Sequence, residues 1–167
     1  MAQPPVLVMG AGAIGCFVGG RLAAAGADVH FVGRARVVQA LREHGLALTD
    51  VEAPGASQRV PAARLHLHEQ LPVDLQPGLA LLCVKSGATQ EAARQLAAGL
   101  APGSCVLSLQ NGVSNADQAQ AAAPGLRVLA GMVPFNVVEL RPGAFHRATS
   151  GQLAAQDDPA LQPYQAA

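Results

Sequence analysis

Val6-Leu7-Val8-Met9-Gly10-Ala11-Gly12-Ala13-Ile14-Gly15, close to the N-terminus, is the stretch that decides the predicted fold. An apolar strand runs directly into a Gly-x-Gly-x-x-Gly motif, and an alanine-rich helical stretch follows to about Ala25. Gly10 permits a tight turn, Gly12 lets the backbone approach a pyrophosphate, and Gly15 lets the helix pack closely on the strand. The order of strand, glycines and helix predicts a dinucleotide-binding loop. The alternative is a glycine turn with a purely structural role.

The residues after the second predicted strand, Val29-His30-Phe31-Val32, indicate which dinucleotide the loop prefers. In a site for NAD, an acidic residue about 20 residues after the motif accepts hydrogen bonds from the ribose hydroxyls. This chain has Gly33-Arg34-Ala35-Arg36 there and no acid. A guanidinium suits a 2′-phosphate, because its planar fork donates two charge-assisted hydrogen bonds to one anion. The sequence therefore favours NADPH with Arg34 as its ligand; the alternative is that Arg34 and Arg36 are solvated loop arginines.

Composition limits the class of protein. The 167 residues suffice for one α/β domain, and 11 basic residues balance 11 acidic ones, so no net charge favours a nucleic acid or a membrane surface. The N-terminal apolar stretch is broken by glycines and follows no basic segment, which argues against a signal peptide and a membrane span. Cys16, Cys83 and Cys105 lack Cys-x-x-Cys spacing. They are predicted to be buried free thiols, which favours a reducing, cytoplasmic setting.

Strands and helices are predicted to alternate along the chain. Further strands are expected at 78–84, 104–109 and 126–133, and helices at 37–44, 89–100 and 115–123. Continuous apolar strands between helices are typical of a Rossmann-type, doubly wound parallel sheet in the α/β class. The segments 46–51 and 59–68 are predicted to be short strands on the edge of this sheet.

The pattern changes after Pro134. Short strands at 137–140, 144–148 and 152–155, with a turn at Arg141-Pro142-Gly143, predict a small antiparallel extension. We expect one domain over residues 1–167, which divides into a core at 1–133, the extension at 134–156 and the start of a helix at 157–167.

Two polar residues stand at predicted strand ends, where an open α/β sheet binds its ligands. Lys85 is the only lysine of the chain and follows the run that ends at Val84. Its compact charge suits a carboxylate or phosphate; the alternative is a lone surface lysine. Asn111 follows the next strand, and its amide could bind a ribose, the nicotinamide carboxamide or a substrate carbonyl. The alternative is a structural Asn111-Gly112 turn.

Two other kinds of site find no support in the sequence. His66 and His68 would share one strand face, but no matching Cys, His or acidic cluster is evident, so no metal site is predicted. A serine hydrolase is not indicated either, because the sequence has no Gly-x-Ser-x-Gly elbow.

Together these motifs resemble the 2-dehydropantoate 2-reductase (ketopantoate reductase) family, over nearly the whole chain. The matching features are Met9–Gly15, Gly33-Arg34, Cys83-Val84-Lys85, Leu109–Val113, and the tail around Pro142–His146 and Ser150–Leu153. In that family NADPH delivers a hydride to the C2 ketone of a 2-keto acid, which gives pantoate for pantothenate and coenzyme A synthesis.

The resemblance implies a role for each candidate residue. The pyrophosphate would be held by Gly10, Ala11, Gly12, Ala13, Ile14 and Gly15. Arg34 would bind the 2′-phosphate, Lys85 and Asn111 would lie by the nicotinamide ribose and the substrate, and Val137 would offer the cofactor a backbone contact. Ser114 departs from the glycine of many relatives.

The resemblance also implies that half of the active site is missing. Family members carry a C-terminal helical domain with a lysine as general acid, but no lysine follows Lys85. That domain is expected to be absent, no catalytic residue is predicted, and the chain is expected to bind NADPH with negligible turnover, since a reduced ketone needs a proton donor. The alternatives are an NADP(H)-sensing module that binds a protein partner, and a reductase of another small-molecule 2-keto acid. Another alternative is that the chain forms a homo-oligomer, which would cover an exposed apolar patch.

Overall fold

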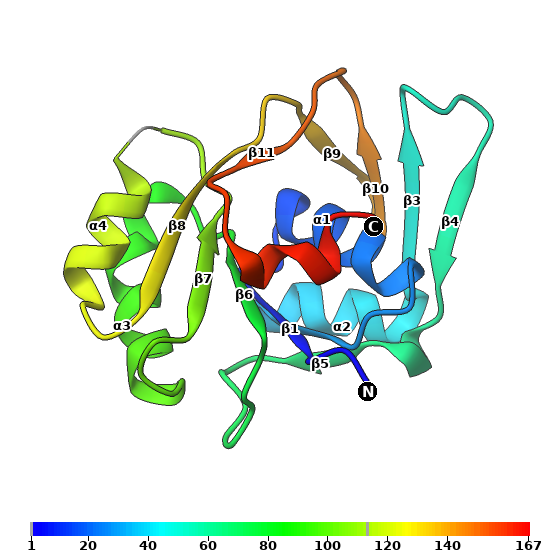
Figure 1. The fold of residues 1–167 in the computed structure, drawn as a ribbon. Coiled ribbons are helices and arrows are strands. Elements are labelled where there is room, and N and C mark those ends of the chain that lie inside the picture. The colour runs from blue at the N-terminus through cyan, green and yellow to red at the C-terminus, as the bar shows by residue number, and fades with distance from the viewer. Residues whose placement is uncertain (1, 113) are drawn as a thin grey trace.

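The structure is a computed structural model that describes residues 2–112 and 114–167, and these residues form two sheets (Figure 1). The larger sheet has the strand order β11-β8-β7-β6-β1-β2-β5, and neighbouring strands run parallel except β11, which is antiparallel to β8. Its strands are β1 Val6–Met9, β2 Val29–Val32, β5 His66–His68, β6 Leu79–Leu82, β7 Cys105–Ser108, β8 Arg127–Met132 and β11 Ala154–Ala155. The α/β class with a mostly parallel sheet is confirmed.

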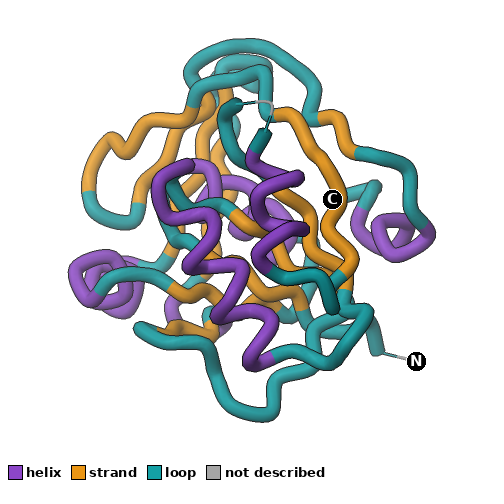
Figure 2. The backbone as a smooth tube through the Cα atoms, turned by 90° about the vertical axis from the view of Figure 1, so that its left-hand side faces the viewer, coloured by secondary structure: helices purple, strands orange, loops and turns teal. Residues whose placement is uncertain are grey.

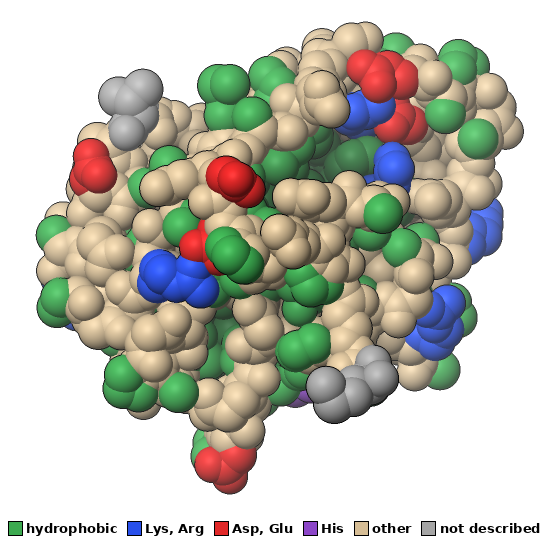
Figure 3. Space-filling view, viewed as in Figure 1, with side chains coloured by type: hydrophobic (Ala, Val, Ile, Leu, Met, Phe, Trp, Pro, Cys, Tyr) green, Lys and Arg blue, Asp and Glu red, His purple; other side chains and the backbone are tan. Residues whose placement is uncertain are grey.

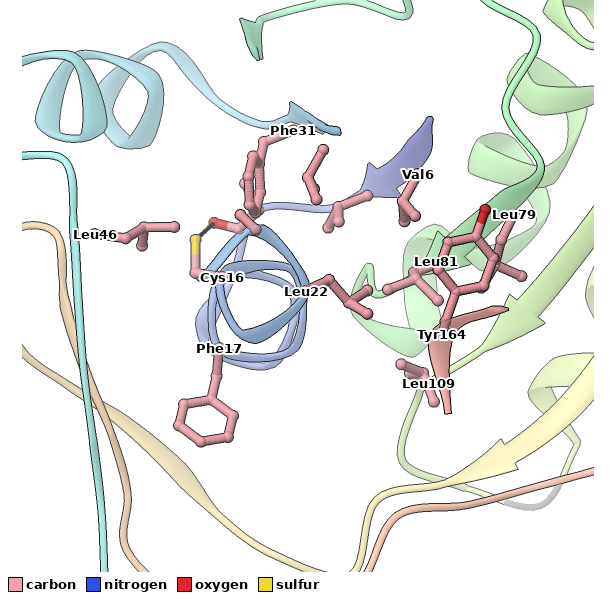
Figure 4. Packing of buried hydrophobic residues seen from close by; sticks show 14 of the residues in the cluster. Val6, Cys16, Phe17, Leu22, Phe31, Leu46, Leu79, Leu81, Leu109 and Tyr164 are labelled. Carbon is pink, nitrogen blue, oxygen red and sulfur yellow. Dashed lines mark hydrogen bonds between the residues drawn. The ribbon is translucent and has the colours of Figure 1, made fainter. Parts of the chain in front are cut away.

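Helices cover both faces of this sheet. Alternate residues of β1 explain why: Val6 and Val8 belong to the apolar cluster around α1 (Ala13–Ala24), while Leu7 and Met9 belong to the cluster beneath α3 (Thr89–Gly99) and α4 (Asn115–Ala122). Figure 2 shows α3 and α4 side by side in front of the sheet. Figure 4 looks along α1 into the other cluster. Strands buried on both faces are made almost entirely of apolar residues, and β1, β6 and β7 are buried along their whole length, with Ser108 at the end of β7 as their one polar residue.

The smaller sheet has the order β4-β3-β10-β9 and corrects two expectations. Its strands are β3 Leu46–Asp50, β4 Ser57–Val60, β9 Val137–Arg141 and β10 Ala144–Arg147. The prediction that the segments 46–51 and 59–68 lie on the edge of the larger sheet is wrong for β3 and β4, and right for β5. The expected β9–β10 antiparallel pair is present, but β10 also pairs in parallel with β3, and β11 joins the larger sheet instead.

Packing on α1 explains where β3 goes. Leu46 and Leu48 are buried against this helix, and a Cβ at Gly20 of α1 would lie 2.9 Å from Leu48 Cδ1. The smaller sheet thus covers a side of α1 that the larger sheet leaves open. Arg147 then ties β10 to β3, because its Nε donates to Asp50 Oδ1 at 2.8 Å and its Nη2 lies 2.7 Å from Asp50 Oδ2.

The remaining helical segments are short. Helix α2 spans Ala35–His44 and begins before the predicted start at 37. Single 3₁₀ turns occupy Ala62–Arg64 and Ser86–Ala88. The predicted helix start at 157–167 is a 3₁₀ helix over Pro159–Tyr164, in which Pro163 lacks the N–H that an α-helix would use. Among the described residues, no helix has the length and apolarity that crossing a membrane requires.

Candidate cofactor-binding site

The glycine loop joins β1 to α1 at the carboxyl end of the larger sheet. Gly10 has a φ of +106°, which glycine adopts without strain, and a Cβ there would lie 2.7 Å from Val84 N. The N–H groups of Gly10 and Ala11 both donate to Val32 O at 3.0 Å. These contacts fix the loop between the ends of β2 and β6, which confirms the tight turn predicted at Gly10.

Gly15 and Gly12 differ in what surrounds them. A Cβ at Gly15 would lie 2.1 Å from Gly10 O and 3.0 Å from Val8 Cγ1, so close packing of α1 on β1 requires glycine there. A Cβ at Gly12 would meet nothing within 4 Å, and the φ of −83° suits any residue. Gly12 is exposed and precedes the first turn of α1, whose N–H groups have no partner within the helix. The protein itself therefore leaves open the space where a phosphate is predicted to bind.

Arg34 lies beside this loop. Gly33 follows β2, and a Cβ there would lie 2.7 Å from Ala11 Cβ, so this turn packs directly on the glycine loop. Arg34 is the N-cap residue of α2 and is exposed, as is Arg36 in the first turn. The structure thus brings Arg34 next to Gly10–Gly15.

Lys85 and Asn111 come together at the next two strand ends. Both are exposed, and Ser86 Oγ donates to Asn111 O at 3.0 Å, which joins the turn after β6 to the turn after β7. Since Val84 contacts Gly10, Lys85 lies close to the glycine loop as well. Val137, by contrast, begins β9 and packs against the α1 cluster, so its predicted contact with the cofactor stays a prediction. Val113, at the end of the matching motif, lies outside the described residues.

A buried polar network supports these two turns, and the sequence analysis missed it. Gln110 Nε2 donates to Val84 O at 2.9 Å and to Thr89 Oγ1 at 2.7 Å, while Ser108 Oγ donates to Gln110 Oε1 at 3.1 Å. Asn115 extends the network: its Oδ1 lies 3.1 Å from Thr89 Oγ1, and its Nδ2 donates to the Asn111 carbonyl. The signal available was a glutamine directly after the predicted apolar strand at 104–109, since a glutamine beside a buried strand needs hydrogen-bond partners.

This network fixes the backbone of the two turns, and its side chains are not predicted to contact the cofactor. Gln110, Thr89, Ser108 and Asn115 are all buried, and their amide and hydroxyl groups join the ends of β6 and β7 to the starts of α3 and α4. Buried polar groups with complete hydrogen bonding make a local structure rigid. The exposed side chains of Lys85 and Asn111 therefore stand on fixed turns.

The expectation of buried free thiols is confirmed for Cys16 and Cys105, whereas the expectation for the histidines is wrong. The three cysteines are free, with Cys16 and Cys105 buried and Cys83 half-buried. Burial raises the pKa of the Cys83 thiol to about 12, so it stays protonated at neutral pH. The interpretation that no matching His or acidic cluster accompanies His66 and His68 is wrong: strand pairing places His30 beside His66, and Asp28, directly before β2, lies next to both.

A cavity lies elsewhere, on the α1 face of the larger sheet. Its volume is about 830 Å³, and Phe17, Leu109, Phe135, Arg147 and Tyr164 are among its lining residues. Figure 3 shows this side of the molecule, with apolar side chains inside a hollow and charged ones at its rim. Neither the glycine loop nor Arg34, Lys85 or Asn111 lines this cavity, so the candidate cofactor site is an open surface built from turns.

Known proteins are similar to this chain in sequence and in fold. A profile of the family described as ketopantoate reductase PanE/ApbA matches residues 6–159. The 2-dehydropantoate 2-reductase of Pyrococcus abyssi is 38% identical over 117 residues, which are 68% of this chain and 35% of that protein. The 2-dehydropantoate 2-reductase of Halobacterium salinarum is 32% identical over 148 residues, 88% of this chain and 47% of that protein.

A solved structure gives the same result. The PanE/ApbA family ketopantoate reductase from Ralstonia eutropha JMP134 is 34% identical and superimposes with a TM-score of 0.78, covering 93% of this chain and 50% of the other. The chain thus spans half or less of the length of these three relatives. With the motifs, the fold and the relatives in agreement, the chain belongs to the ketopantoate reductase family.

Proposed function

We propose that this chain is the NADPH-binding part of a cytoplasmic 2-dehydropantoate 2-reductase. The reaction is reduction of the C2 ketone of 2-dehydropantoate to pantoate, a step of pantothenate and coenzyme A synthesis. On this proposal residues 1–167 are one cofactor-binding domain. The single observation that carries the proposal is the glycine loop, in which Gly10 and Gly15 are required by the protein's own packing while Gly12 faces open space.

The loop would bind the pyrophosphate through its backbone. The first N–H groups of α1 have no partner within the helix, and the helix dipole adds partial positive charge at the same end. Ala13, Ile14 and Gly15 form that first turn. Gly12 matters because a side chain there would stand in the space that the phosphates need.

Arg34 would select the phosphorylated cofactor. It is exposed, it adjoins the glycine loop through Gly33, and the turn carries no carboxylate that would repel a 2′-phosphate. A charge-assisted hydrogen bond contributes about 1.5–3 kcal/mol, which corresponds to roughly one to two decades in affinity.

Lys85 and Asn111 would face the nicotinamide ribose and the substrate. When bound, NADPH supplies the hydride for the ketone. The Lys85 ammonium would attract the carboxylate of the keto acid, and the Asn111 amide would orient a ribose hydroxyl or the ketone oxygen. Residues 86–167 contain no lysine, and the proposed site assigns no side chain as proton donor, so we expect this chain alone to turn over 2-dehydropantoate negligibly.

Calorimetric titration of the pure chain with NADPH and with NADH tests the cofactor assignment. We expect NADPH to bind at least tenfold more tightly than NADH. Arg34→Ala should reduce NADPH affinity roughly 10- to 100-fold and leave NADH affinity unchanged, whereas the matched control Arg36→Ala should change both little. An absence of heat with either cofactor, or an unchanged preference in Arg34→Ala, would contradict the proposal.

A second assay tests the expected lack of turnover. 2-Dehydropantoate is added to the NADPH complex, and the absorbance of NADPH is followed. A steady decrease that depends on the keto acid would show that the chain contains its own proton donor and is a complete reductase.

A further inference from the structure

Four polar side chains gather at the outer edge of the larger sheet, along the neighbouring strands β2 and β5. Asp28 directly precedes β2, His30 lies in β2, and His66 and His68 lie in the edge strand β5. The parallel register pairs His30 with His66 and Val32 with His68. The function proposed above makes no use of these residues, so they need a separate explanation.

The spacing of their ligand atoms fits a small metal ion. Single ligand atoms of Asp28, His30 and His66 all lie within 4.8 Å of one another. Asp28 Oδ1 is 3.0 Å from His66 Nε2 and 3.5 Å from His30 Nε2. Tetrahedral zinc with bonds of about 2.0–2.1 Å separates its ligand atoms by about 3.3 Å. The carboxylate oxygen therefore already stands at about the right distance from both imidazoles.

His68 holds His30 in a suitable orientation. His30 Nδ1 lies 3.0 Å from His68 Nε2, and the planes of the two rings are nearly parallel, at 2°. Histidines that bind a metal commonly use their second ring nitrogen in such a hydrogen bond, which fixes the tautomer and the ring direction. The His30 side chain is only 15% exposed.

We propose that Asp28, His30 and His66 bind one Zn²⁺ ion, with His68 as a positioning residue and water as the fourth ligand. The ion would lie between the Asp28 carboxylate and the two imidazoles, each of which would bind it through a ring nitrogen that carries no proton. The His66 ring is stacked on His30, with ring centroids 4.3 Å apart, and must turn to direct its lone pair at the metal. Its side chain is 54% exposed, which leaves room for that rotation. The bound ion would connect β2 to the edge strand β5.

Zinc titration of the full, untagged chain after treatment with EDTA tests the site. We expect uptake of one Zn²⁺ per chain and a rise in melting temperature. His66→Ala and Asp28→Asn should each weaken binding at least tenfold. His44→Ala is the matched control, because His44 is 55% exposed and lies 3.7 Å from the Glu43 carboxylate without a third ligand. It should bind zinc like the wild type. Absence of one-to-one uptake, or equal affinity in His66→Ala and His44→Ala, would overturn the proposal.

Further measurements separate loss of a metal ligand from loss of the fold and from metal binding by the cysteines. Circular dichroism and melting in EDTA should be the same for His66→Ala and His44→Ala, which separates loss of a ligand from loss of the fold. Substitution with Co²⁺ should give the visible absorption of a tetrahedral site with nitrogen and oxygen ligands. His68→Gln should weaken metal affinity about tenfold while that spectrum persists. A thiolate-to-cobalt charge-transfer band would instead assign the metal to the cysteines and contradict the proposal.

Discussion

The two ends of strand β2 carry two candidate sites that are built in different ways. At the carboxyl end, Gly33 packs on the glycine loop, and the groups that would hold the pyrophosphate are backbone N–H groups at the start of α1, while Arg34 would add a side-chain contact to the 2′-phosphate. At the amino end, Asp28 and His30 meet His66 through strand pairing, and the groups that would hold a ligand are side chains. The first site depends on glycines whose positions leave no room for a Cβ atom. The second depends on which side chains the strand pairing brings together.

This difference determines how each site responds to mutation. A backbone site should lose stability or binding when a methyl group is added, because its glycines are in contact with backbone atoms or face the ligand. A side-chain site should tolerate substitution and lose only the interaction that the side chain makes. Four substitutions, from the largest expected effect to the smallest, test this contrast.

Gly10→Ala should destabilise the fold most. The new Cβ would lie 2.7 Å from Val84 N, and the φ of +106° is unfavourable for alanine. We expect the free energy of unfolding in urea to fall by about 3 kcal/mol or more. The control is Gly26→Ala, where φ is +101° but nothing lies within 4 Å of the new Cβ; it should cost about 1 kcal/mol. Equal losses in the two variants would mean that the contact with Val84 is unimportant.

Gln110→Leu should come next. Leucine fills the space but leaves Val84 O and Ser108 Oγ without the amide that they contact. Each unpaired buried group costs about 1–3 kcal/mol, so we expect a loss of about 2–3 kcal/mol in urea unfolding. NADPH affinity should also fall, because the turn that carries Lys85 loses its support. Gln118→Leu is the control, since Gln118 is exposed and donates only to Ser114 Oγ. If Gln118→Leu is as destabilising as Gln110→Leu, the buried network does not support the turn that carries Lys85.

Gly12→Ala should separate binding from folding. With nothing within 4 Å of the new Cβ, stability should change by less than about 1 kcal/mol. NADPH affinity should fall at least tenfold, because the methyl group enters the space assigned to the phosphates. Gly125→Ala, also without a neighbour within 4 Å, should affect neither property. If Gly12→Ala binds NADPH as tightly as the wild type, the phosphates do not bind at this position.

The smallest effect should be a pH dependence at the histidine cluster. Burial, followed by the adjacent His66, lowers the pKa of His30 below its ordinary 6.5 in the folded chain. Asp28 opposes this shift, and His68 adds to it. As pH falls below 6.5, the unfolded chain therefore binds more protons, and stability decreases. His30→Gln should reduce that decrease by less than about 1 kcal/mol, measured as the urea midpoint in EDTA between pH 7.5 and 5.5. His44→Gln should leave the profile unchanged; a steeper profile in His30→Gln would contradict the assignment.

Features that depend on residues close together in the sequence could be predicted from it. The strand, glycines and first helix follow one another within Val6–Ala24, and the turn geometry of Gly10 and the packing of Gly15 match the expected roles. Arg34 was found for the same reason, because its position relative to the loop depends on one strand. Its preference for a 2′-phosphate stays a prediction.

Features that depend on long-range pairing could not be predicted. Alternating residues in β3 show that one face is buried but not which element buries it, so its pairing with β10 went unseen. His30 and His68 are 38 positions apart, and only the register brings their rings together. At the end of β7, the sequence drew attention to exposed Asn111, whereas buried Gln110 makes the connections.

The free cysteines make the native core accessible to a kinetic measurement. Cys16 lies in α1 and Cys105 in β7, both buried, and burial raises the pKa of each thiol. A disulfide reagent can therefore modify them only when the surrounding structure opens, and the labelling rate at each position reports that opening. The Cys83 backbone contacts Gly10, so a change in the labelling rate of Cys83 on addition of NADPH would report whether cofactor binding makes this part of the loop more rigid.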